Sequence, residues 1–249
     1  MPVTALVIRQ ASKNDTRERS NWLRRQERQA ITWLCQRTPQ FVTSNMLTGL
    51  GLVGAVVISL SLTAAGQNRW WLLGAIPGLA LHWLGDSLDG RLAYFRNRSR
   101  KWFGFALDLM MDWISLCVVA AGLALYFSSL RFVPIVFMVA YGGRMLIAVV
   151  HYTIAKVYRI DSGKIGPTEV RLLLACAVLG EIFLPGSLLL LTSLATLALL
   201  VVDGLELAQL LSAADQRDRA ERPRDWGKTA APAARPQRAT LLELFFPQN

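Results

Sequence analysis

The sequence predicts an all-α integral membrane protein with six transmembrane helices, an N-terminal interfacial amphipathic helix and a disordered C-terminal tail. Of the 249 residues, 53% are hydrophobic, and the mean hydropathy is +0.35. The apolar runs are long enough to cross a bilayer, which takes about 20 residues of helix. The basic residues, which give a formal net charge of +10, lie mainly between and around these runs. This placement is typical of a multi-span membrane protein.

The distribution of Lys and Arg predicts the orientation of the chain. If the N-terminus is cytoplasmic, six spans return the C-terminus to the same side, and all but three of the 27 Lys and Arg residues then lie there. Arg69 and Arg131 lie on the opposite side, and Arg144 lies within a span. This bias predicts that both termini are cytoplasmic, and we expect a bacterial-type inner membrane. Because the basic residues flank and join the spans, contact with anionic lipid is favoured over contact with nucleic acid.

Residues 1–42 are predicted to form a cytoplasmic N-terminal segment. From about Arg19 to Phe41, tryptophans and aliphatic side chains are interspersed with arginines. This pattern predicts an amphipathic helix that lies on the membrane surface. A solvated helix that packs on the protein is an equally good interpretation.

Residues 43–210 are predicted to form the six-helix membrane domain. The spans are expected at about 46–65, 70–94, 103–127, 133–152, 168–185 and 188–207. Ser44 or Asn45 is expected to cap the first span.

Residues 211–249, rich in Ala, Arg, Asp and Pro, are predicted to form a disordered cytoplasmic tail. Three scattered cysteines, without a Cys-x-x-Cys motif, favour small buried side chains over a disulfide framework or a zinc site.

Four aspartates lie at the facing ends of the second and third predicted spans. Asp86 and Asp89 are i, i+3 neighbours, and Asp108 and Asp112 are i, i+4 neighbours, so each pair shares one helix face. An ionisable side chain within a span costs about 2.5–3.5 kcal/mol even on the lenient insertion scale. Because carboxylate oxygens bind hard divalent cations, the pattern predicts a Mg²⁺ or Mn²⁺ site near the cytoplasmic face.

Basic residues beside this predicted site indicate a phosphate-bearing substrate. A metal ion can polarise phosphoryl oxygens, and a carboxylate that is partly free of metal can accept a proton from an attacking hydroxyl. Gly90, Ala93 and Gly104 are small, so a nucleotide could approach the backbone beside the acids. Arg144, inside the fourth predicted span, is costly unless it faces a cavity or an anion.

The spacing of these residues resembles the signature of the CDP-alcohol phosphotransferases. The matching pattern is Asp86-x-x-Asp89-Gly90-x-x-Ala93 followed by Gly104-x-x-x-Asp108-x-x-x-Asp112. The family pattern has arginine after the alanine, where this chain has Tyr94. The segment from Ser44 to Thr48 is similar to the Pro-Asn-x-Leu-Thr entry of the family's first span. Six spans with both termini cytoplasmic also look like this family, and the resemblance covers roughly residues 40–210.

The resemblance implies an enzyme that cleaves the pyrophosphate of a CDP-linked alcohol, releases CMP and joins the remaining phosphate to a second alcohol. It implies that Asp86, Asp89, Asp108 and Asp112 surround two divalent ions, Mg²⁺ or Mn²⁺, and that Asp112 is the general base. It places five residues at the nucleotide: Asn45, Thr48, Gly90, Ala93 and Gly104. Arg144 and Lys164 are candidates for acceptor or phosphate contacts, and a homodimer is expected.

The leading hypothesis is a membrane phospholipid synthase that transfers a phosphatidyl group from CDP-diacylglycerol to a small polar alcohol. Serine, glycerol phosphate, inositol or its phosphate, and choline all stay open as acceptors. The signature does not exclude the reverse arrangement, in which CDP-choline or CDP-ethanolamine is the donor and diacylglycerol the acceptor. A non-catalytic membrane protein that binds metal or nucleotide is the third hypothesis. A transporter is disfavoured, because transporter sites usually lie near the bilayer midplane.

Overall fold

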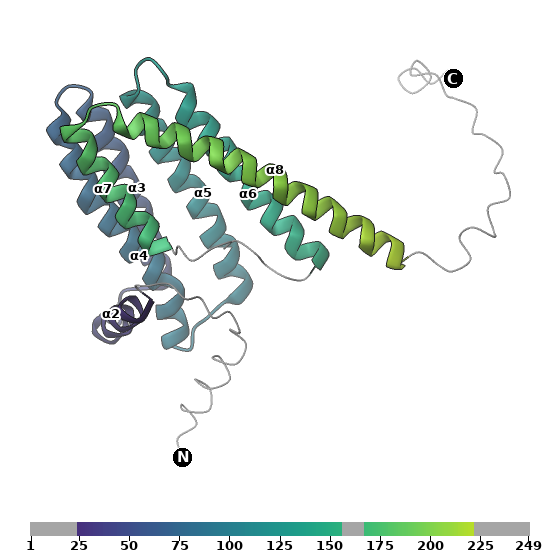
Figure 1. Ribbon diagram of the computed structural model, residues 1–249. Helices are drawn as coiled ribbons and strands as arrows, with labels where there is room; N and C mark the ends of the chain where they lie inside the picture. Colours follow the sequence, from purple (N-terminus) through teal and green to yellow (C-terminus); the bar gives the residue numbers. More distant parts are fainter. Residues whose placement is uncertain (1–23, 156–166, 222–249) are drawn as a thin grey trace, which may run out of the picture.

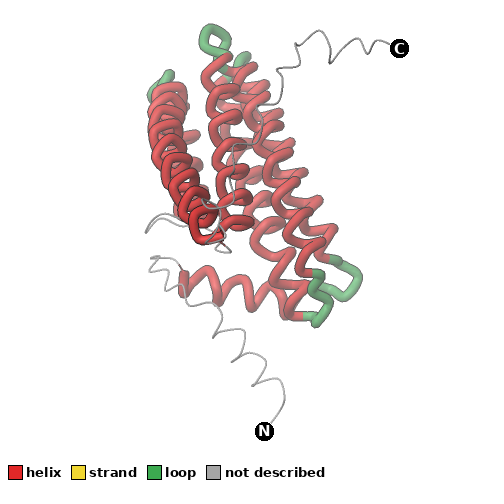
Figure 2. The backbone as a smooth tube through the Cα atoms, turned by 90° about the vertical axis from the view of Figure 1, so that its right-hand side faces the viewer, coloured by secondary structure: helices red, strands yellow, loops and turns green. Residues whose placement is uncertain are grey.

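A computed structural model of the chain describes residues 24–155 and 167–221 (Figure 1). In this part of the chain the structure is helical and contains no strand (Figure 2). The α-helices are α2 (Arg24–Arg37), α3 (Ser44–Ala65), α4 (Ala75–Phe95), α5 (Lys101–Tyr126), α6 (Phe132–Ala155), α7 (Pro167–Phe183) and α8 (Ser187–Glu221). A short 3-10 helix, η1 (Arg69–Gly74), precedes α4. The prediction of an all-α chain is therefore confirmed for the described residues.

The six helices from α3 to α8 follow the predicted spans in order. Among the described helices, α3, α5, α6 and α8 are long and apolar enough to cross a membrane. Helix α7 has only 17 residues, and α4 carries Asp86, Asp89 and Arg91 within its 21 residues. The four apolar helices fit an integral membrane protein. Crossing of the membrane by α4 and α7, and the cytoplasmic location of both termini, stay predictions.

Helix α3 is central to the bundle because it packs against both α4 and α5. Its contact with α4 brings the two backbones together through glycines. A Cβ atom on Gly85 would lie 2.3 Å from the backbone nitrogen of Gly51, and one on Gly54 would lie 2.4 Å from the backbone nitrogen of His82. Small residues allow this close approach of two helices. This contact sets the position of Asp86 and Asp89 along the axis of α3.

The start of α3 differs from the prediction by one residue. Thr43, in extended conformation, is the N-cap, and its Oγ1 accepts a hydrogen bond from the Met46 amide at 3.3 Å. The expectation that Ser44 or Asn45 caps the helix is therefore wrong. The Ser44 hydroxyl instead donates to the carbonyl oxygen of Asp89 at 2.8 Å. This bond ties the first turn of α3 to the end of α4.

Helix α2 lies across one end of the bundle (Figure 2). Ile31 and Cys35 are buried against side chains of α3 and α4, and this burial raises the pKa of the Cys35 thiol. Trp33 on the same helix is about half exposed, and the Arg37 guanidinium lies 4.3 Å from its ring centroid. The helix therefore packs on the protein. Contact of Trp33 and the arginines with a membrane surface stays a prediction.

The opposite end of the bundle contains a separate hydrophobic core. It joins the C-terminal parts of α3, α5 and α7 to η1 and to the start of α8. Its largest members are Ile58, Leu62, Leu72, Phe127, Ile182 and Leu188. This core therefore lies at the end of the bundle remote from α2 and from the four aspartates.

Helix α8 packs along α6 and continues to Glu221, past residue 211, where the disordered tail was predicted to begin (Figure 1). The extension has local and tertiary support. Arg217 pairs with Glu221 at 2.6 Å, one turn along the helix. Its guanidinium also donates to the carbonyl oxygens of Thr153 and Ile154, at 3.2 and 2.8 Å. These contacts stabilise the C-terminal ends of α6 and α8. Residues 222–249 lie outside the described part of the chain.

Candidate active site

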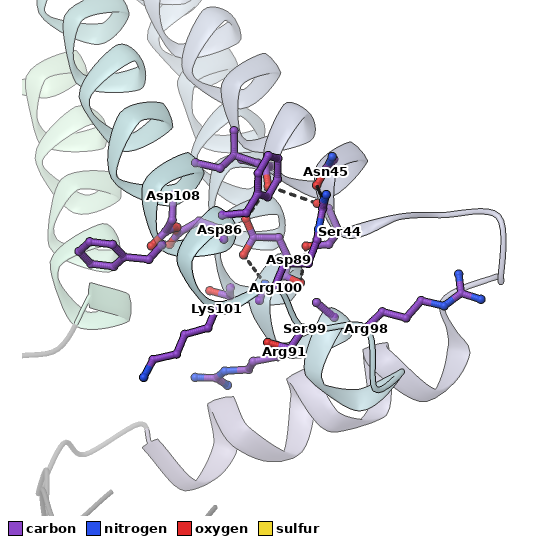
Figure 3. A pocket seen from close by; sticks show the side chains of 18 of the residues that line it. Ser44, Asn45, Asp86, Asp89, Arg91, Arg98, Ser99, Arg100, Lys101 and Asp108 are labelled. Carbon is purple, nitrogen blue, oxygen red and sulfur yellow. Dashed lines mark hydrogen bonds between the residues drawn. The ribbon is translucent and has the colours of Figure 1, made fainter. Parts of the chain in front are cut away.

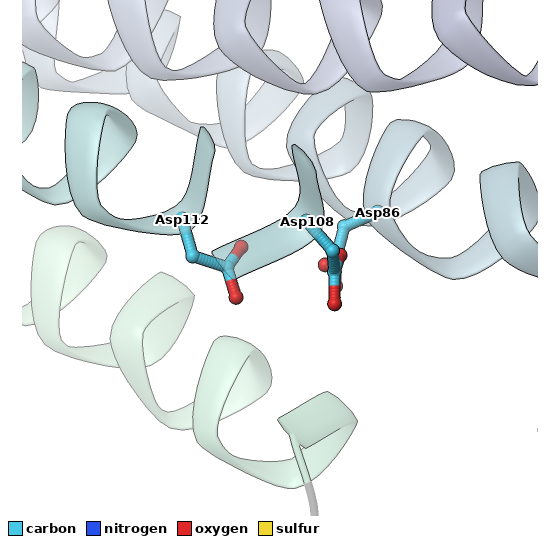
Figure 4. Close-up of side chains that lie close together, drawn as sticks. All are labelled: Asp86, Asp108 and Asp112. Atoms are coloured by element: carbon cyan, nitrogen blue, oxygen red, sulfur yellow. The ribbon is translucent and has the colours of Figure 1, made fainter. Parts of the chain in front are cut away.

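Three of the four predicted aspartates form a compact cluster. Asp86 comes from α4, and Asp108 and Asp112 come from successive turns of α5 (Figure 4). One carboxylate oxygen from each lies within 4.8 Å of the other two. The i, i+4 spacing aligns the two α5 side chains, and α3 holds α4 and α5 in place beside them. An all-oxygen set of three carboxylates fits a hard divalent cation such as Mg²⁺ or Mn²⁺.

The fourth predicted aspartate, Asp89, lies apart from this compact group. It is buried, and its Oδ2 accepts a hydrogen bond from the Thr48 hydroxyl at 2.7 Å. Its Oδ1 accepts a second bond from the Gly90 amide at 2.5 Å. Two donors therefore hold the buried Asp89 carboxylate in place. Its role as a metal ligand stays a prediction.

Replacing Thr48 with valine tests the importance of this contact. We expect Thr48→Val to lower the free energy of unfolding by about 1–3 kcal/mol, because the buried Asp89 carboxylate loses a donor. The measurement is the thermal unfolding of the purified protein in detergent. Thr63→Val is the matched control, because Thr63 donates only to its own helix, to the Ser59 carbonyl at an exposed position. Equal midpoints for the two variants would contradict the prediction.

A cavity of about 510 Å³ opens beside the aspartates (Figure 3). All five residues predicted to contact a nucleotide line it: Asn45, Thr48, Gly90, Ala93 and Gly104. Asp86, Asp89 and Asp108 line it as well. Asp112 lines a smaller adjoining pocket that shares Thr48, Asp86, Asp89 and Asp108 with the main cavity. The tertiary structure thus brings the predicted nucleotide residues and the acids to one place.

The α4–α5 turn and its flanks add positive charge to the cavity wall. The basic lining residues in this region are Arg91, Arg98, Arg100 and Lys101 (Figure 3). Arg100 donates to the Asn45 side-chain oxygen at 3.2 Å, and its guanidinium lies 3.9 Å from the Phe103 ring centroid. Glu27 of α2 also lines the cavity and lies 3.7 Å from the Arg91 guanidinium. A concave site with this charge attracts anionic ligands.

Tyr94, at the position where the family signature has arginine, is about half exposed and lies outside the lining residues. The neighbouring arginines have different surroundings. Arg91 lines the cavity, whereas Arg96 turns to the segment between α2 and α3. The Arg96 guanidinium donates to four backbone carbonyl oxygens, those of Thr38, Pro39, Gln40 and Val42. Arg96 therefore anchors the α2–α3 connection, whereas Arg91, like Arg98 and Arg100, is placed to meet a ligand in the cavity.

The structure adds Arg171 to the site, a residue that the sequence analysis did not select. Arg171 lies in the first turns of α7, lines the cavity and forms an ion pair with Asp86. The signal that drew attention to Arg144, a charged side chain inside an apolar segment, applies equally to Arg171. Arg171 lies next to the predicted loop, and this position in the sequence is also typical of an ordinary basic residue at the membrane interface.

Arg144 does not line the cavity. Its guanidinium lies 3.3 Å from Asp203 and 2.9 Å from Glu206, both on α8. Ionisable side chains within membrane helices commonly pair in this way, so the three residues stabilise the contact between α6 and α8. An acceptor contact by Arg144 stays a prediction. Lys164, the other predicted contact, lies outside the described residues.

The fold and the site together fit an integral membrane protein with a cluster of carboxylates beside a basic cavity. The family model described as CDP-alcohol phosphatidyltransferase matches residues 41–203, which is more than half of the chain. The chain belongs to this family, whose members are phosphotransferases that act on CDP-alcohols. The matched range includes all the cavity-lining residues except Glu27. A comparison with curated proteins gives no match.

Proposed function

We propose that this protein is a phospholipid synthase that transfers a phosphatidyl group from CDP-diacylglycerol to a small polar alcohol and releases CMP. The observation that carries the proposal is the contact between the three-aspartate cluster and the basic cavity. Asp86 and Asp108 belong to both, and the predicted nucleotide residues surround them. The family membership supplies the reaction class. The apolar helices allow a lipid-linked donor to reach the site from the bilayer.

The nucleotide end of the donor is assigned to the cavity wall formed by α3, α4 and the start of α5. Asn45 and Thr48 offer polar groups there. A Cβ atom added to Gly90 or to Gly104 would meet no other atom within 4 Å, so the space beside both backbones is open. The small side chains therefore let the nucleotide approach the helices. Arg91 and Arg100 supply positive charge for its phosphates.

The acids are assigned to two divalent ions, Mg²⁺ or Mn²⁺. Asp86, Asp108 and Asp112 would hold an ion through one oxygen each, and Asp89 would complete the set from the adjoining wall. When bound, such ions polarise the phosphoryl oxygens and stabilise negative charge on the departing CMP. With these ions bound, the carboxylates would also help to orient the pyrophosphate of the donor.

Asp112 is assigned as the general base. Its carboxylate lies within 4.8 Å of the other two cluster members, in a pocket adjoining the cavity. In the proposed reaction Asp112 accepts the proton of the acceptor hydroxyl, whose oxygen attacks the phosphorus of the phosphatidyl group. The bond between that phosphorus and the oxygen of CMP breaks, and CMP departs with the bonding electron pair. Positioning by the helices would keep the acceptor oxygen, the phosphorus and the departing CMP oxygen in line, with Asp112 beside the acceptor hydroxyl.

The test is CMP release by the purified protein in detergent, with Mg²⁺, CDP-diacylglycerol and one acceptor at a time. The acceptor panel contains serine, glycerol phosphate, inositol, inositol phosphate and choline. We expect CMP release with one acceptor, and loss of release when a chelator removes the divalent ion. Release only from CDP-choline or CDP-ethanolamine with diacylglycerol would reverse the assigned donor and acceptor. CDP binding without release against every acceptor would support the non-catalytic hypothesis.

A homodimer in a bacterial-type inner membrane, with the active site at the cytoplasmic face, completes the proposal. The concentration of basic residues around the cavity end of the bundle supports this orientation. The test is sulfhydryl labelling in intact cells. Single cysteines are placed in the 66–69 turn or in the 96–100 turn of the protein. Labelling of the 96–100 turn by an impermeant reagent from outside would contradict this orientation.

A further inference from the structure

Arg171 brings a positive charge into direct contact with the three-aspartate cluster. It lies in the first turns of α7, which packs against α4, and its Nη2 pairs with Oδ2 of Asp86. The Arg171 and Asp86 side chains are 19% and 25% exposed, so water and salt screen the pair only partly. The contact is a charge-assisted hydrogen bond, which is stronger than one between neutral groups.

Asp86 belongs to this ion pair and to the cluster at the same time. One of its oxygens lies within 4.8 Å of an oxygen from Asp108 and one from Asp112. An ion bound by the three carboxylates would therefore share Asp86 with the Arg171 guanidinium. Two cations on one carboxylate repel each other and draw on the same negative charge. Each therefore weakens the binding of the other.

Arg171 also lines the cavity, so its guanidinium has an alternative place to bind an anion. The guanidinium fork binds phosphate oxygens with the same geometry as carboxylate oxygens. Arg144 is not equivalent, because Asp203 and Glu206 of α8 hold its guanidinium outside the cavity lining. Among the described arginines, Arg171 is therefore the one that pairs with the acid cluster and also lines the cavity.

We propose that Arg171 is an exchangeable counter-ion of the acid cluster. It neutralises Asp86 in the metal-free protein and turns to a phosphate oxygen of the substrate once Asp86 serves as a metal ligand. The inference rests on the proposed function for the divalent ion and the phosphate. Its consequence is a coupling in which metal and phosphate ligand each bind more tightly in the presence of the other, because Arg171 exchanges one partner for the other.

Mn²⁺ titration of the purified full-length protein tests this coupling without turnover. Free Mn²⁺ is followed by electron paramagnetic resonance, with and without CDP, after subtraction of Mn²⁺ binding by CDP in buffer. Without CDP, we expect Arg171→Gln to bind Mn²⁺ about fivefold or more tightly than the native protein, because the competing cation is gone. CDP should then strengthen Mn²⁺ binding less than it does in the native protein. Arg171→Lys retains the charge and should stay closer to native affinity.

Arg98→Gln is the matched control, because it removes the same charge from another side chain of the cavity wall. Its effect on Mn²⁺ affinity should be clearly smaller than that of Arg171→Gln. Unchanged Mn²⁺ affinity in Arg171→Gln, or an equal gain in Arg98→Gln, would overturn the exchange and leave the metal site intact. Failure of the native protein to bind Mn²⁺ would overturn the exchange together with the metal site of the proposed function.

Discussion

Replacement of Asp112 by asparagine is expected to lower CMP release by about 100-fold or more, because general-base catalysis contributes roughly 10²–10⁴-fold to such reactions. Asparagine has nearly the same shape as aspartate but cannot accept the proton of the acceptor hydroxyl. It also removes one anionic ligand from the cluster. The measurement is the rate of CMP release with saturating CDP-diacylglycerol, Mg²⁺ and the preferred acceptor.

Asp215→Asn is the control for this change. Asp215 lies near the exposed end of α8 and pairs with Arg219 at 2.8 Å, away from the cavity. The same chemical change there should leave CMP release near the native rate. The thermal midpoints of both variants should be measured in parallel, because a lower midpoint for Asp112→Asn alone would point to a folding defect. A folded Asp112→Asn protein with native turnover would show that another group accepts the proton.

The second large effect is expected from a methyl group between α3 and α4. In Gly85→Ala the new Cβ would lie 2.3 Å from the Gly51 nitrogen and 2.5 Å from the Leu47 carbonyl oxygen. Both atoms belong to the backbone, so no rotamer change can relieve the clash and the helices must separate. Overpacking of this kind costs about 1–3 kcal/mol and sometimes more. The thermal midpoint in detergent should fall, and CMP release should fall with it as the α4 aspartates shift.

Gly49→Ala provides the comparison within α3. A Cβ atom at Gly49 would meet no atom within 4 Å, so alanine adds no clash there. Because alanine favours the helix over glycine by about 1 kcal/mol, Gly49→Ala should be as stable as the native protein or more so. A Gly85→Ala protein as stable as Gly49→Ala would mean that the backbones are not in contact at this point.

Local spacing was sufficient to predict several features of the site. The i, i+4 relation of Asp108 and Asp112 places both on one face of any helix that contains them, whatever surrounds it. Gly90 follows Asp86 by four residues and Gly104 precedes Asp108 by four, so each leaves room beside an acid on its own helix in the same way. The extents of α3, α5 and α6 follow from apolar runs that are long enough to span a membrane.

Other features depend on which helices are neighbours. Thr48 and Asp89 are 41 residues apart, and their hydrogen bond exists because glycines bring α3 and α4 into contact. Arg144 and Arg171 are both arginines within predicted spans, yet one meets two acids of α8 and the other meets Asp86. The local sequences of the two arginines do not predict which acids they pair with, because the partners lie 59 to 85 residues away in the chain.

By itself, the sequence determined the helical class, the order of the helices and the identity of the acidic residues. These follow from apolar length and from the helical repeat, which are properties of short segments. Only the tertiary structure separated Asp89, held by Thr48, from the cluster of Asp86, Asp108 and Asp112, and only it placed Arg171 on that cluster. The physical reason is that the partner of a charged side chain is set by helix packing, which brings together residues remote in the chain.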